Sequence, residues 1–181
     1  MQDEVLRKLL QALEPPVKHK VFVSYHHTLD QAYYEAFSTK FHDAYEAIHD
    51  NSLDDEIDSD NSDYVMRKIR EEYLTGTSCT LVLIGAETYK RKYIDWEIKA
   101  TLDKSHALIG IYLPTAKRNE FDNKIVVPGR LYDNIISGFA SFVSWAAITA
   151  SADALDQHIK TAKSKSKTLI NNNRVKKARN G

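Results

Sequence analysis

The chain has 181 residues, of which 43% are hydrophobic, and its 25 acidic and 25 basic residues give a formal net charge of zero. This length suits one domain with its own core, and balanced charge argues against a strongly basic nucleic-acid binder. A single cysteine, Cys79, excludes an internal disulfide, and no apolar run is long enough to span a bilayer. The first residues lack the order of a secretory signal, so we expect a cytoplasmic protein with no membrane partner.

The chain begins with a segment that predicts a helix. Apolar residues recur at helical spacing over residues 4–13, and Pro15-Pro16 ends the pattern. We therefore expect a helical extension over residues 1–17. It would dock either on the rest of the domain or on a second copy of the chain, which would make a homo-oligomer.

Residues 18–170 alternate between apolar runs and helical patterns. The runs at 20–25, 79–84 and 107–113 predict buried strands. Helical spacing covers 30–45 and 62–73, with Ser62 as the expected cap of the second helix, and it returns after residue 92. Strands that alternate with helices of this length predict an α/β fold, flavodoxin-like, with a mainly parallel sheet flanked by helices.

The remainder of the chain is less regular. Residues 114–138 are polar and rich in turn residues, and 139–145 predict either an edge strand or the entry to a last helix. A C-terminal helix is expected over about 151–170. Residues 171–181 are basic and lack apolar spacing, so we expect a flexible tail.

Several candidate ligand sites can be set aside. The acidic stretch 54–63 does not fit a calcium loop that opens at Asp58, because Asp63 replaces the required glycine and Ile69 the required glutamate. It is most simply a solvated loop. The histidines show no metal-ligand spacing, and the glycines form no dinucleotide or phosphate-loop pattern. We therefore predict no metal and no cofactor.

Polar residues follow the first predicted strand. Ser24, Tyr25, His26 and His27 come directly after an apolar run, at the end of a strand where α/β proteins bind ligands. The hydroxyl groups and backbone amides could hold ribose or phosphate, and a histidine could titrate near neutrality. The alternative is ordinary turn chemistry that caps the next helix, with Asp30 as its cap or first-turn acid.

Glu97 is the leading candidate for chemistry. It lies in the helix that follows the strand 80–84 and Gly85, four residues after Tyr93 and next to Trp96. A glutamate enclosed by aromatic rings can bind a sugar or stabilise an oxocarbenium-like transition state. The alternative is a solvated surface carboxylate, which is the usual state of a helical glutamate.

Taken together, Val21-Phe-Val-Ser-Tyr25, Leu81-Val-Leu-Ile-Gly85, Thr88-Tyr89 and Tyr93-Ile-Asp-Trp-Glu97-Ile98 resemble motifs of TIR and TIR-like domains. The likeness is to the TIR-like proteins of the bacterial Thoeris anti-phage system, the ThsB type, and it covers roughly residues 18–114. The resemblance implies a flavodoxin-like fold and cleavage of the nicotinamide–ribose bond of NAD, which would be a substrate and not a cofactor. It further implies a diffusible cyclic ADP-ribose-type product that activates a separate effector protein.

By position, the resemblance implies that Glu97 is the catalytic glutamate and that Tyr93 stands where the family usually has tryptophan. It places Ser24, Tyr25 and His26 on a loop that lines the nucleotide pocket, and the acidic segment on the loop that covers it. A non-catalytic TIR-like scaffold or nucleotide-binding module is the alternative. An enzyme needs Glu97 in a pocket that Ser24 and Tyr25 also line, whereas a scaffold would leave Glu97 solvated or paired with Arg91 or Lys99.

Overall fold

The computed structural model describes residues 18–47 and 61–181, together with Glu4. Its centre is a five-stranded sheet in the order β2-β1-β3-β4-β5, in which each neighbouring pair is parallel. The strands are β1 (His19–Ser24), β2 (Tyr45–Ala47), β3 (Cys79–Ile84), β4 (Ala107–Tyr112) and β5 (Ser141–Ser144). This confirms the prediction of an α/β fold with a mainly parallel sheet.

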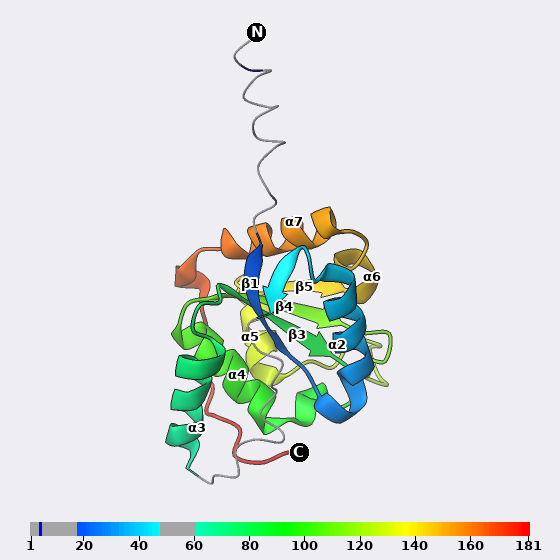
Figure 1. The fold of residues 1–181 in the computed structure, drawn as a ribbon. Coiled ribbons are helices and arrows are strands. Elements are labelled where there is room, and N and C mark those ends of the chain that lie inside the picture. The colour runs from blue at the N-terminus through cyan, green and yellow to red at the C-terminus, as the bar shows by residue number, and fades with distance from the viewer. Residues whose placement is uncertain (1–3, 5–17, 48–60) are drawn as a thin grey trace.

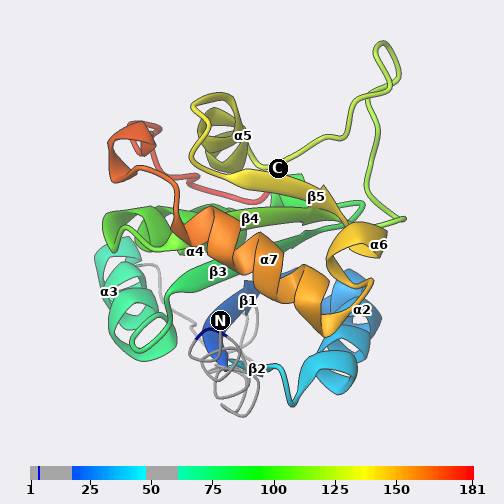
Figure 2. The same cartoon turned by 90° about the horizontal axis from the view of Figure 1, so that it is seen from above.

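Helices cover both faces of the sheet (Figures 1 and 2). One face carries α2 (His27–Phe41), α6 (Trp145–Ile148) and α7 (Ala152–Lys163). The other carries α3 (Ser62–Lys68), α4 (Lys92–Asp103) and α5 (Gly129–Ile136). Shorter turns of helix are η1 (Ile69–Tyr73, of π type), η2 (Thr88–Lys90) and η3 (Lys167–Leu169).

The strands β1, β3 and β4 bury side chains on both faces of the sheet, which explains their continuous apolar sequences. In β1, Val21 and Val23 face α2 and α7, while Phe22 packs with the α3 and α4 side. All six residues of β3 are buried. Cys79 belongs to this core, and burial raises the pKa of its thiol to about 12, so the thiol stays protonated.

Several predicted boundaries shift. Asn61, not Ser62, caps α3, since its side chain accepts hydrogen bonds from the next backbone amides. The segment 139–145 contains both alternatives, an edge strand followed by a helix. The last long helix ends at Lys163, and the stretch predicted as an irregular excursion contains α5.

The largest correction concerns residues 171–181, which we call the C-terminal strap. The sequence predicts a flexible tail, but the strap is fastened to the α4–α5 side of the domain by a series of hydrogen bonds (Figure 1, red). Its basic side chains form part of these contacts: Arg174 forms two bonds with Asp133, and Lys176 contacts Asp63. Local composition indicated a tail because these partners lie far away in the sequence.

Two predictions concern residues outside the described part of the chain. These are the N-terminal extension over 1–17, apart from Glu4, and the acidic stretch up to residue 60. Among the helices that the structure describes, none has the length and apolar character needed to cross a membrane.

Candidate active site

The site lies where β1 and β3 end side by side. These strands pair in parallel, with Ser24 opposite Val82, so their carboxyl ends open at the same edge of the sheet. Gly85 and η2 follow β3 and lead directly into α4. Such an edge is where α/β proteins bind ligands, because loops and helix starts converge there.

Ser24 and Glu97 meet at this edge. The Ser24 hydroxyl donates a hydrogen bond to Glu97 Oε2 over 2.5 Å, and the Glu97 residue is 1% exposed. Glu97 is therefore not a solvated surface carboxylate. Lys99, which the scaffold alternative offered as a partner, pairs instead with Asp103.

The backbone of Glu97 is also held. Its carbonyl oxygen accepts a hydrogen bond from Thr101 Oγ1 over 2.8 Å. Thr101 Oγ1 lies 2.8 Å from Thr80 Oγ1 on β3, so a buried polar contact links helix and sheet one turn further on. Glu97 is thus fixed by two connections, one from β1 and one through β3.

The aromatic neighbours of Glu97 lie on the same side of the sheet. Tyr93 is half-buried and makes an edge contact with Trp96, with ring centroids 5.5 Å apart. Lys92 Nζ lies 4.9 Å from the centroid of the Tyr93 ring. One turn of helix separates Tyr93 from Glu97, so the spacing predicted from sequence is preserved in α4.

Tyr25 is placed differently. It packs in the cluster beneath α2, on the opposite face of the sheet from Ser24 and Glu97. Its ring stacks on Tyr34 at 4.6 Å and on His27 at 4.7 Å between centroids, and its hydroxyl donates to Gln31. Side chains of successive residues point to opposite faces of an extended strand, which separates Tyr25 from Ser24.

His26 takes the role of a helix cap. Its backbone is extended, and its Nδ1 accepts a hydrogen bond of 3.4 Å from the Leu29 amide at the start of α2. This is the turn chemistry that the sequence offered as the alternative to ligand binding. Of the five predicted site residues, the structure therefore brings Ser24, Glu97 and Tyr93 to one side, while Tyr25 packs against α2 and His26 caps it.

A second buried carboxylate, that of Asp30, lies at this edge of the sheet. Asp30 is 1% exposed, and the Thr88 hydroxyl lies 3.4 Å from its Oδ2. Thr88 Oγ1 also accepts a hydrogen bond from the Gly85 amide over 2.8 Å. A Cβ at Gly85 would lie 2.1 Å from Asp30 Oδ1, so only glycine permits this approach.

Asp30 lies in the first turn of α2 and contacts Thr88 after β3, so it connects the segments that follow these two neighbouring strands. The pKa of its side chain is also shifted. Burial raises the pKa of its carboxyl to about 6, although hydrogen bonds from Thr88 and the His26 backbone lower it. The sequence offered Asp30 as a cap or first-turn acid, and it lies in the first turn of α2. No local pattern connects residue 30 with residue 85, so the contact required the tertiary structure.

No group of three or more His, Cys, Asp or Glu side chains in the described part of the chain is arranged to hold a metal ion. The chemistry available at the strand ends is that of the carboxylates Glu97 and Asp30 with the hydroxyls Ser24 and Thr88.

Comparison with known proteins identifies the family. A family model described as the TIR-like domain of the Thoeris protein ThsB matches residues 22–118. The chain belongs to the ThsB TIR-like family. The matched region contains the second half of β1 and all of β3, α4 and β4, and with them both Ser24 and Glu97.

A relative in Bacillus cereus (strain MSX-D12) carries the name "Putative cyclic ADP-D-ribose synthase ThsB1". It is 27% identical over 121 residues, which is 67% of this chain and 56% of the relative. The aligned part therefore spans little more than half the length of that ThsB protein.

Proposed function

We propose that this ThsB-family chain cleaves NAD and forms a cyclic ADP-ribose-type molecule, with Glu97 as the catalytic carboxylate. The observation that carries the proposal is the Glu97 side chain, which is buried at the carboxyl edge of the sheet and oriented by Ser24. The family match and the name of the Bacillus cereus relative support the same chemistry.

The first step breaks the bond between nicotinamide and ribose. Nicotinamide leaves with the bonding electron pair, so positive charge develops on the ribose C1′ and its ring oxygen. A carboxylate held close to this charge stabilises the transition state, most strongly where water is excluded. The Ser24 hydrogen bond fixes one Glu97 oxygen, so the carboxylate would need little reorganisation as the charge forms.

The second step closes the ring. A nucleophilic atom of the same nucleotide attacks C1′, forms the new bond and loses its proton, provided that the nucleotide is folded and water is kept out. Water attacking C1′ would instead give linear ADP-ribose. Because Glu97 is buried, NAD must displace whatever covers the carboxylate before either step begins.

In the cell, we propose that the product acts as a diffusible signal that activates a separate effector protein in anti-phage defence. Product analysis tests the chemistry. Purified protein is incubated with NAD, alone and with an extract of infected cells, and the products are separated by chromatography with mass detection. A cyclic isomer supports the proposal, linear ADP-ribose alone indicates a hydrolase, and intact NAD in both conditions would favour a signalling scaffold.

A further inference from the structure

The C-terminal strap contacts the part of α4 that carries Glu97. Lys177 is the centre of these contacts. Its amide donates to Asp95 Oδ2 over 2.9 Å, and its carbonyl oxygen accepts from Trp96 Nε1 over 2.8 Å. The two backbone groups of one strap residue therefore hold the two residues that immediately precede Glu97.

The strap also completes the start of α4. Arg91 is the cap residue of this helix and forms no side-chain capping bond. The amide of Lys92, in the first turn, instead donates to Asn180 Oδ1 over 2.8 Å. Asparagine is among the preferred capping residues because its side-chain oxygen satisfies such amides, and here it comes from 88 positions along the chain.

A buried ion pair joins α4 to α5, and its arginine also contacts the strap. Arg130 is 0% exposed and donates from Nε to Asp95 Oδ1 over 3.0 Å and from Nη2 to Oδ2 over 3.3 Å. Its Nη1 donates to Asn172 of the strap over 2.7 Å. Asp95 is thus bonded to α5 directly and to the strap through Lys177.

We propose that the strap is a positioning element of the active site, in which the Lys177 backbone and the Asn180 side chain fix α4 so that Glu97 stays in register with Ser24. This inference rests on the proposed function, because Glu97 must be catalytic for its position to affect turnover. A displacement of about 1 Å in a reacting group can lower the rate about 100-fold, so a modest loosening of α4 has a measurable effect.

Four variants of the full chain test the proposal. Lys177→Pro removes the amide that donates to Asp95, whereas Lys177→Ala keeps it, and both lose the Lys177 ammonium contact with the Tyr89 carbonyl. Asn180→Ala removes the cap, whereas Asn180→Asp retains an acceptor oxygen and is the rescuing variant. For each protein, kcat and KM for NAD are measured, together with hydrogen–deuterium exchange of the peptide that spans residues 92–97.

We expect kcat for Lys177→Pro to be at least about tenfold below that of Lys177→Ala, with little change in KM, because the geometry of Glu97 and not NAD binding is altered. We expect Asn180→Ala to exchange faster than wild type in the first turn of α4, and Asn180→Asp to restore slow exchange and kcat. Unchanged exchange in both Lys177→Pro and Asn180→Ala would overturn the proposal, as would faster exchange with an unchanged kcat. Wild-type protein without NAD turnover would contradict the proposed function, while exchange would still decide whether the strap holds α4.

Discussion

The hydrogen bond between Ser24 and Glu97 joins two residues that are 73 positions apart in the chain. Replacing Ser24 by alanine leaves a buried carboxylate without this donor, which costs roughly 1.5–3 kcal/mol for a bond to a charged group. We predict that Ser24→Ala lowers both the free energy of unfolding and kcat for NAD. A double-mutant cycle with Glu97→Ala, which removes both carboxylate oxygens, is followed by urea unfolding and measures the coupling between the two side chains; additive effects would contradict the contact.

Asp30 gives the site a dependence on pH. Its folded-state pKa of about 6 lies above the ordinary 3.8, so between these values the folded state binds more protons than the unfolded state. The contribution of the Asp30 carboxyl to the free energy of unfolding is therefore fully present below about pH 4 and is lost as the pH rises through 6. We predict that the Asp30→Asn variant does not show this loss. The unfolding free energy of the variant minus that of the wild type should therefore increase between pH 4 and pH 7 by on the order of 1–3 kcal/mol. An unchanged difference across this range would refute the assignment.

The meeting of Ser24 and Glu97 could be anticipated from sequence, since both follow predicted parallel strands whose carboxyl ends lie at one edge. The position of Tyr25 could have been anticipated too, because Val21, Val23 and Tyr25 share one face of an alternating strand. The Asp30–Gly85 approach could not, because it depends on how the start of α2 meets the loop after β3.

At the scale of elements, a buried ion pair between Asp95 of α4 and Arg130 of α5 holds α4 in place. Removing one partner of a buried pair leaves an uncompensated charge, which costs about 3–5 kcal/mol. We predict this loss for Arg130→Met in urea unfolding. Arg174→Met is the matched control: its pair with Asp133 is 47% exposed on the arginine side, so about 1 kcal/mol or less is expected. Equal losses in the two variants would show that the buried pair has no special role.

The strands β1, β3 and β4 were predictable from their continuous apolar runs, and α4 was predictable because its apolar residues recur at helical spacing. The C-terminal strap and α5 were not. The strap has no period of its own, and its order comes from partners such as Asp95 and Asp133, which are 82 and 41 positions away. The α5 helix has only 8 residues, which is too short for a clear pattern within a polar segment.

At the scale of the whole molecule, the sheet and its two helical layers form the stable body, and the segment between β4 and α5 extends away from it (Figure 2). Phe121 in this segment is 98% exposed, whereas Phe139 is completely buried beside α4 and β4. We predict that Phe121→Ala changes the unfolding free energy by less than about 0.5 kcal/mol. Phe139→Ala should cost about 3–5 kcal/mol. A large loss in Phe121→Ala would mean that this segment contributes to the core.

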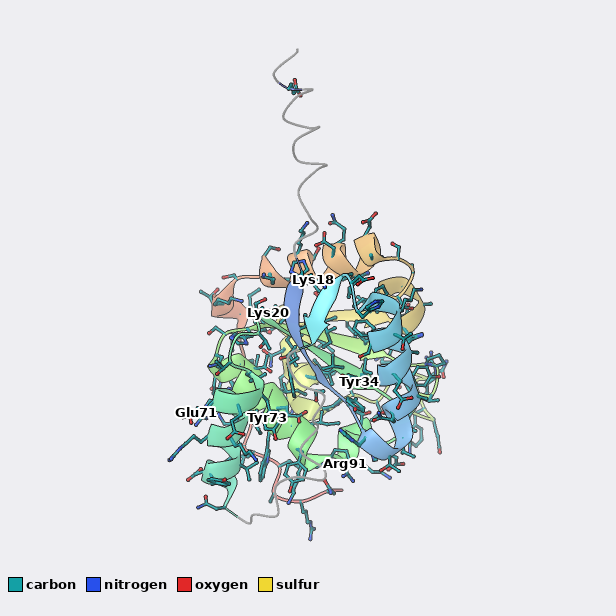
Figure 3. All side chains as sticks on the ribbon, viewed as in Figure 1. Lys18, Lys20, Tyr34, Glu71, Tyr73 and Arg91 are labelled. Carbon is teal, nitrogen blue, oxygen red and sulfur yellow. The ribbon has the colours of Figure 1, made fainter. Side chains whose placement is uncertain are left out.

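Product formation from NAD by the Glu97→Gln variant tests whether Glu97 performs the chemistry. Glutamine keeps the size of the side chain and removes its negative charge. Glu71→Gln is the control, since Glu71 is exposed on η1, extends from the outer side of the domain in Figure 3 and undergoes the same chemical change. We predict that Glu97→Gln lowers the rate of product formation by about 100-fold or more, with Glu71→Gln close to wild type. Wild-type product formation by folded Glu97→Gln protein would show that Glu97 is not the catalytic carboxylate.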